Sequence, residues 1–299
     1  MGSAATKPGR LGTAAALAAL VCIWGTTWAV IRVGLRGMPP FTGVALRFFL
    51  AAAVLLALSP FFAVKLGRDR VERRLWLANT LLTFAIPYGV LYWAEQWVPS
   101  GLTSVLFATF PLMVAVVAHF TLRERLNTRG ILGILVGFAG IAVIFSEDFQ
   151  ALGGPGVATA AAVALIAPFS AAFGSIVIKK WGSEVHPIST AAVPMGMAAL
   201  LMGALALAVE RGRPLHFDTP SVLAVLYLAI VGSAVPFTLY FWLLKHQTAT
   251  AMSMVNYATP VIAVVVGTVF LSEPFTLRVL LGTALVLVGV GVALRKKTT

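Results

Sequence analysis

Apolar runs of about 20 residues recur along the whole chain, and this pattern limits the possible folds more than any other. Each run is long enough to cross a hydrocarbon core of about 30 Å as a helix, which satisfies its own backbone polar groups. The pattern predicts an all-α membrane protein. The ten spans that we count cover approximately residues 11–31, 41–64, 75–93, 102–122, 131–145, 157–178, 188–208, 222–244, 249–271 and 277–294.

The composition argues against a soluble protein. Of the 299 residues, 60% are hydrophobic and 11% are charged, and the mean hydropathy is +0.95. A soluble fold with so few polar residues could not cover its surface. The segments between spans are at most about 14 residues long, too short to hold a soluble domain. The membrane part is therefore expected to be the whole protein.

The basic residues predict the orientation in the membrane. A net charge of +12 would suggest nucleic acid in a soluble chain, but an excess of Lys and Arg in short loops marks the cytoplasmic side of a membrane protein. With the N-terminus inside, sixteen basic residues fall in cytoplasmic segments and Arg47 lies within a span; the outside segments hold Arg32, Arg36, Arg211, Arg213 and Arg278. We expect a multi-pass inner (cytoplasmic) membrane protein with both termini in the cytoplasm, an uncleaved first helix and no nucleic-acid partner.

The two halves of the chain resemble each other. At an offset of 149, residues 87–145 align without a gap with residues 236–294. Chance pairing of Gly, Ala and Val would not also match these positions: Pro87 with Pro236, Trp93 with Trp242, Ser104 with Ser253, Pro111 with Pro260, Glu124 with Glu273, Gly133 with Gly282 and Gly140 with Gly289. At an offset of 145, Trp24 and Trp28 align with Phe169 and Phe173.

Residues 1–150 and 151–299 are therefore predicted to be two repeats of five helices each. Because five is an odd number, consecutive copies lie in opposite orientations, which is the plan of many secondary transporters. Two such units around a central cavity can exchange conformations and open it first to one side and then to the other. This alternating access is the strongest functional prediction of the sequence.

The repeated residues resemble the EamA-type branch of the drug/metabolite transporter superfamily over the whole chain. Its opening pattern is similar to residues 24–28 (WGTTW), 39–40 (PP) and 45–48 (ALRF). Its closing pattern is similar to Ser104, Pro111, Glu124, Gly133 and Gly140 with their partners 149 residues later. The second repeat departs from the opening pattern, with Pro194 near the place where an arginine is expected. The resemblance implies a ten-helix basket around a cavity and export of amino acids or related metabolites, with aromatic and neutral amino acid exporters most similar.

Prolines and aromatic pairs indicate where cargo would bind. Each of Pro87, Pro111, Pro236 and Pro260 leaves a backbone carbonyl without its usual donor and is expected to kink its helix. Three aromatic pairs have i, i+4 spacing, so each pair shares one helical face and could line a pocket: Trp24 and Trp28, Tyr88 and Tyr92, and Phe169 and Phe173. The alternative is that these rings pack between helices or form an interfacial belt.

Polar residues far from span ends are further candidates, because polar side chains in hydrocarbon tend to face the bundle interior. Ser253, Asn256 and Tyr257 form such a stripe before Pro260, whereas the first repeat has Ser104, Phe107 and Ala108 at these positions. Hydroxyl and amide groups could bind the zwitterionic end of an amphipathic substrate. The alternative is hydrogen bonding between helices.

Other residues of the spans are interpreted structurally. Arg47 is close enough to the end of its span to snorkel, and a structural or gating ion pair suits it better than substrate contact. Glu124 is expected to cap or pair at a helix end, and the glycines matched at an offset of 149 are expected to pack helices closely. Cys22 is the single cysteine, so an intramolecular disulfide is excluded.

The acidic residues suggest how transport is driven. All ten lie near span ends, and a proton-coupled antiporter normally keeps a carboxylate in mid-membrane. We therefore predict facilitated transport of small neutral or zwitterionic cargo by a monomer. Phosphorylated cargo would need several cationic side chains in the cavity, and cationic drugs a buried acid beside aromatic rings. A proton-coupled exporter of drugs or other metabolites is the alternative.

A membrane-embedded transferase is the distant alternative. Such enzymes need clustered aspartates for a metal ion, or a nucleophile with its base. The spans contain no Asp, and no metal-ligand spacing of His and Glu occurs. We expect no enzymatic activity, no metal and no cofactor.

Overall fold

The computed structural model describes residues 9–67, 69–98, 100–125, 127–270 and 276–294, and the regular elements of this part of the chain are helices. Proline and glycine divide several spans into shorter pieces. In chain order the elements are α1 Arg10–Gly37, α2 Pro40–Leu58, η1 Ser59–Phe62, α3 Arg70–Asn79, η2 Thr80–Ala85, α4 Ile86–Ala94, α5 Ser100–Phe107, α6 Phe110–Leu122, α7 Thr128–Ile144, η3 Ser146–Gly153, α8 Val157–Ala164, α9 Ile166–Trp181, α10 Pro187–Val209, α11 Thr219–Ala229, η4 Ile230–Ala234, α12 Val235–His246, α13 Ala249–Ser253, α14 Val255–Phe270 and α15 Leu277–Leu294.

Several of these segments have the length and hydropathy of membrane spans. Among the described residues seven qualify: Leu11–Gly37, Pro40–Phe62, Arg70–Ala94, Val105–Leu122, Val157–Trp181, Pro187–Val209 and Thr219–His246. The helices α7 and α15 are apolar but shorter. An all-helical membrane protein is thus confirmed, and the number of ten spans stays a prediction.

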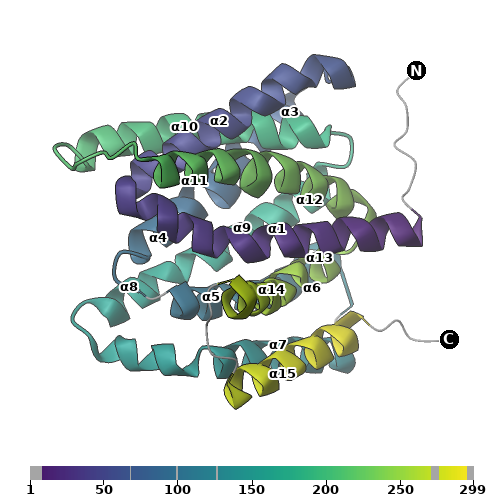
Figure 1. Ribbon diagram of the computed structural model, residues 1–299. Coiled ribbons are helices and arrows are strands. Elements are labelled where there is room, and N and C mark those ends of the chain that lie inside the picture. Colours follow the sequence, from purple (N-terminus) through teal and green to yellow (C-terminus); the bar gives the residue numbers. More distant parts are fainter. Residues whose placement is uncertain (1–8, 68, 99, 126, 271–275, 295–299) are drawn as a thin grey trace.

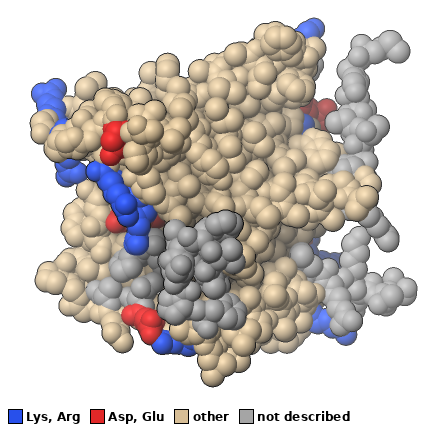
Figure 2. Space-filling view, in the orientation of Figure 1, with Lys and Arg blue, Asp and Glu red and all other residues tan. Residues whose placement is uncertain are grey.

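The helices run side by side and form one bundle (Figure 1). The beginning of α1 and the end of α15 lie at the same end of the bundle, on the right of the view. Charged side chains gather toward the left and right ends of the face in Figure 2, and the described residues across its middle are uncharged. Because charged side chains are costly in hydrocarbon, this distribution fits helices that cross the membrane from left to right in the view.

Two proline positions share the same local structure. The π-helix η2 precedes Pro87 and the π-helix η4 precedes Pro236. A proline has no N–H for the carbonyl one turn earlier and its ring crowds that carbonyl, so the helix widens locally. The other two positions differ: Pro111 follows the break between α5 and α6, whereas Pro260 lies inside α14, several residues after the break at Met254.

Glycines hold α7 and α15 in close contact. A Cβ atom on Gly133 would lie 2.6 Å from the Gly289 carbonyl oxygen, and one on Gly140 would lie 2.6 Å from the Gly282 carbonyl oxygen. Their close packing is therefore confirmed. Because Gly133 aligns with Gly282 and Gly140 with Gly289, the contacts are reciprocal, as a two-fold axis between the helices would make them.

Two glutamates join the halves of the chain at opposite ends of the bundle. Glu124 accepts hydrogen bonds from the Ala249 and Thr250 N–H groups at the start of α13, at 2.8 and 3.2 Å. Glu210 does the same at the start of α2, with the Phe41 and Thr42 N–H groups at 2.8 and 2.9 Å. Each carboxylate satisfies N–H groups that a helix start leaves free. The predicted capping role of Glu124 is confirmed.

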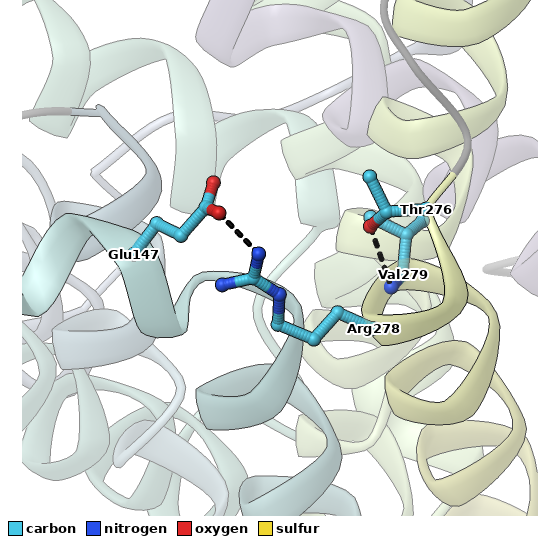
Figure 3. A network of polar contacts seen from close by, with 4 residues as sticks. All are labelled: Glu147, Thr276, Arg278 and Val279. Atoms are coloured by element: carbon cyan, nitrogen blue, oxygen red, sulfur yellow. Dashed lines mark hydrogen bonds and ion pairs between the residues drawn. The ribbon is translucent and has the colours of Figure 1, made fainter.

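A surface ion pair joins η3 to α15. Figure 3 shows the Arg278 guanidinium directed toward the Glu147 carboxylate, with which it forms this pair. Beside it the Thr276 hydroxyl accepts a hydrogen bond from the Val279 N–H at the first turn of α15. Both charged side chains are exposed, and such pairs contribute at most about 1 kcal/mol.

Candidate functional site

A cavity of about 100 Å³ lies among the helices, and eight of its 19 lining residues are aromatic. Side chains of both halves contribute to it. The lining residues are Trp24, Thr27, Trp28 and Ile31 of α1; Arg47 of α2; Thr83 of η2; Pro87, Tyr88, Leu91 and Tyr92 of α4, with Glu95 just after it; Phe107 of α5; Phe110 of α6; Ala171 and Ser175 of α9; Phe237 and Tyr240 of α12; and Asn256 and Thr259 of α14.

Five of the predicted substrate-binding residues line this cavity. They are Trp24, Trp28, Tyr88, Tyr92 and Asn256, which come from three different helices. The rings make edge contacts with further aromatic residues: Trp24 lies 5.5 Å from Phe237 between ring centroids, and Trp28 lies 6.2 Å from Phe107. The wall can therefore stack on an apolar or aromatic group.

The phenylalanine pair of α9 lies elsewhere. Phe169 and Phe173 are 54% and 38% exposed and contact each other on the outside of the bundle. The cavity side of α9 carries Ala171 and Ser175, which lie two residues further along the chain. Two residues correspond to about 200° around a helix, so the offset of 145 paired Trp24 and Trp28 with the wrong face of α9.

The polar stripe of the ninth predicted span does not act as a unit. Ser253 is fully buried, and its hydroxyl donates to the Thr250 carbonyl of its own helix at 2.8 Å. Tyr257 is also fully buried, with its ring against Gly137 of α7. Of the three candidates only Asn256 lines the cavity, together with Thr259 about one turn later in α14.

Arg47 is buried, at 1% exposure, and serves as a hydrogen-bond hub. Its Nε donates to the Ser233 hydroxyl at 2.7 Å, its Nη1 to the Tyr92 hydroxyl at 3.1 Å and its Nη2 to the Gly232 carbonyl at 3.0 Å. The guanidinium also lies 4.8 Å from the Tyr88 ring centroid, a cation–π contact. Arg47 does not snorkel, and its predicted structural role rests on these contacts rather than on an ion pair.

The helix break at Pro236 explains one of these bonds. Pro236 lacks the N–H group that would bond the carbonyl of Gly232, four residues earlier. This carbonyl accepts the Arg47 hydrogen bond. A buried cation in the wall of the cavity thus bonds a backbone carbonyl four residues before a proline.

Several aromatic lining residues were missed in the sequence, although the repeat identifies two of them. Phe237 is the equivalent of Tyr88, and Tyr240 is the equivalent of Leu91, at the offset of 149. Tyr240 shares a hydrogen bond of 3.1 Å with Ser175, which ties α12 to α9. Applying the repeat to the tyrosine pair would have placed α12 on the cavity.

Glu95 lies where the cavity meets a second, larger one of about 510 Å³, which we call the vestibule. The charged and polar residues of the vestibule are Arg32, Arg36, Glu95, Gln96, Arg213 and His216. Burial raises the pKa of the Glu95 carboxyl to about 8, against the opposing effect of Arg32 and Arg47. The expectation that the cavity lacks an acid beside its aromatic rings is therefore wrong.

Comparison with known proteins assigns the chain to a family. The sequence model of the EamA-like transporter family matches twice, at residues 11–146 and 158–295. The chain belongs to the EamA-like transporter family. This is a family of transporters and not of enzymes, and the cavity of this EamA-like chain contains aromatic and hydroxyl groups suited to binding rather than to chemical conversion.

The relatives of this EamA-like chain carry transporter names. The uncharacterized inner membrane transporter YedA of Escherichia coli is 34% identical over 256 residues, which are 85% of this chain and 81% of YedA. The uncharacterized transporter YoaV of Bacillus subtilis is 27% identical over 268 residues, 90% of this chain and 91% of YoaV. A solved crystal structure with 20% identity has a TM-score of 0.82 over 96% of this chain and 97% of its own, which shows the common fold.

Proposed function

We propose that this EamA-like transporter exports small neutral or zwitterionic metabolites across the cytoplasmic membrane, and that amino acids, including aromatic ones, are its cargo. The observation that carries the proposal is the cavity itself. Eight aromatic side chains line its wall, and its cation Arg47 already donates to three acceptors. Phosphorylated cargo would need unoccupied cationic groups, whereas an apolar or aromatic side chain fits between rings.

Alternating access is proposed on the basis of the repeat. Support comes from the reciprocal glycine contacts of α7 and α15, and from the π-helices that precede Pro87 and Pro236 at equivalent positions. Both features are expected if the halves are inverted copies of one unit. Both chain ends then lie in the cytoplasm, which labelling of single introduced cysteines from either side of the membrane would test.

The coupling of transport has to be measured. Facilitated transport is predicted because every acidic residue lies near a span end, as Glu95 does directly after α4, but Glu95 also lines the cavity. A proton-coupled exporter of cationic drugs is therefore the second candidate, favoured by the acid beside aromatic rings. Uptake of a cationic dye together with proton movement at a fixed ratio would favour it, and amino acid flux without proton movement would favour facilitated export.

The decisive test is the uptake of a labelled amino acid panel into proteoliposomes. Trp28→Ala removes a ring of the cavity wall and is expected to lower the uptake of aromatic amino acids at least tenfold. Phe169→Ala removes a ring from the outside of the bundle and is the matched control, with uptake like that of the wild type. Absence of uptake for every member of the panel, or equal uptake by the two variants, contradicts the proposal.

A further inference from the structure

Glu95 stands out among the charged groups of the cavity wall because one oxygen of its carboxylate is buried without a hydrogen-bonding partner among the described residues. Its Oε1 atom is buried and accepts no hydrogen bond from the residues that the structure describes. The backbone at this position is held, since the Glu95 N–H donates to the Leu91 carbonyl at 2.9 Å. Glu95 lines both the cavity and the vestibule.

The neighbouring cations have other partners or lie too far away for an ion pair. Arg47 donates to Ser233, Tyr92 and Gly232. Arg213 donates to the Gln96 side-chain oxygen at 3.0 Å. Within the described part of the chain, the ion pair that forms is that of Arg278 with Glu147. A buried carboxylate oxygen without a partner is costly, and a ligand that donates a hydrogen bond would satisfy it.

We propose that Glu95 binds the ammonium group of the cargo at the mouth of the aromatic cavity. The inference rests on the proposed function and deepens it, because it names the cargo group that is recognised and the residue that recognises it. A carboxylate next to aromatic faces is the arrangement that proteins use for organic cations. The remainder of the cargo then occupies the space between Trp28, Tyr88 and Phe237.

This role makes binding depend on pH in a defined direction. The carboxyl of Glu95, with its pKa raised to about 8 by burial, is mostly protonated at pH 6 and half ionised at pH 8. Because an ammonium group binds the ionised form, affinity increases as the pH rises, by up to about fiftyfold between pH 6 and pH 8 for a carboxyl titrating near 8. Binding at neutral pH then releases a proton.

Other charged and titratable groups surround Glu95 and have to be separated from it. They are Arg32 and Arg36 of α1, Arg47 of α2, Tyr92 of α4, and Arg213 and His216 of the segment between α10 and α11. Histidine is the residue type in this set that ordinarily titrates near neutral pH. His216→Asn is therefore the control, and this variant is expected to keep the pH dependence of the wild type.

The experiment compares two inhibitors of phenylalanine uptake into proteoliposomes. Phenethylamine has the amine without the carboxylate, and 3-phenylpropionate has the carboxylate without the amine. We expect phenethylamine to inhibit the wild type more strongly, and Glu95→Gln to lower the ratio of the two affinities at least tenfold and to remove the pH dependence. Glu95→Asp keeps the charge and should retain part of the preference. An unchanged ratio in Glu95→Gln, or an equal loss for both inhibitors, overturns the inference.

A second measurement keeps the two proposals distinguishable. Thermal unfolding of the purified protein reports ligand binding without transport. If the wild type takes up no amino acid but is stabilised by phenethylamine, and Glu95→Gln is not, the proposed cargo is wrong and the cation site stands. If phenethylamine stabilises the wild type and Glu95→Gln equally, the cation site is wrong whatever the cargo. Should Glu95→Gln fail to fold, the pH series of the wild type and of Glu95→Asp decides.

Discussion

The helices α4 and α12 occupy equivalent places in the two repeats but present different side chains. Both follow a π-helix, both have a proline in their first turn, and both reach the cavity. At an offset of 149, the first helix has polar groups where the second has apolar ones: Tyr88 against Phe237, Tyr92 against Phe241 and Glu95 against Leu244. Phe241 and Leu244 are buried in the main hydrophobic core, whereas Glu95 borders two cavities.

The difference shows how a repeated fold acquires a directional binding site. The backbone features that come from proline are the same in both copies, because they depend on a missing N–H group. The side chains then decide which end of the bundle is packed and which can meet a polar ligand. In the second repeat Phe241 and Leu244 are buried in the core. In the first repeat the equivalent positions carry the Tyr92 hydroxyl and the Glu95 carboxylate, which line the cavity.

Removing Arg47 is expected to have the largest effect, because this residue of α2 connects α4 to the π-helix that precedes α12. It bonds to Tyr92 on α4 and to Gly232 and Ser233 in η4, just before α12. Arg47→Met leaves these buried groups without partners, at a cost of about 1–3 kcal/mol for each one that water cannot reach. We expect a large loss of thermal stability in detergent. Arg36→Met, at an exposed position of α1, is the control, and equal stability of the two variants would contradict the hub role.

The contact between α7 and α15 tests whether the halves are also held together away from α4 and α12. A Cβ atom on Gly289 would lie 2.4 Å from the Gly137 backbone nitrogen, whereas one on Gly291 meets nothing within 4 Å. Gly289→Ala is therefore expected to destabilise the protein by about 1–3 kcal/mol, as overpacking commonly does. Gly291→Ala, on the same helix, should leave the unfolding temperature nearly unchanged. Equal effects of the two alanines would show that the close contact is not needed.

The sequence allowed the helical membrane fold and part of the site to be predicted, for identifiable reasons. Hydrocarbon demands long apolar helices, and proline disrupts a helix wherever it occurs, so spans and breaks follow from residue type. The rotation of a helix about its axis is set by packing with its neighbours. A shift of two residues was enough to confuse Phe169 and Phe173 with Ala171 and Ser175.

Glu95 was missed for a related reason. It follows the last residue of α4 directly, and in the sequence it is one more acidic residue at the end of a span. Only the packed bundle shows that this end is covered by α1, α2 and the segment after α10, so that the carboxylate is buried. Burial of a group at a helix end depends on distant segments, which the local pattern of residues does not contain.

Tyr240 provides the smallest and most selective test of the difference between α4 and α12. At this position α12 has the polar residue and α4 the apolar one. Its equivalent on α4 is Leu91, and its hydroxyl shares a hydrogen bond of 3.1 Å with Ser175 of α9. Tyr240→Phe should cost about 1 kcal/mol of stability, the usual net value of a neutral hydrogen bond, and keep the ring in the cavity wall. Ser175→Ala should cost a similar amount, and the double variant should cost less than the two together, since each change alone already breaks the same bond. Strictly additive losses in thermal unfolding would mean that the two hydroxyls act independently, and that the packing of α12 against α9 depends on ring contacts alone.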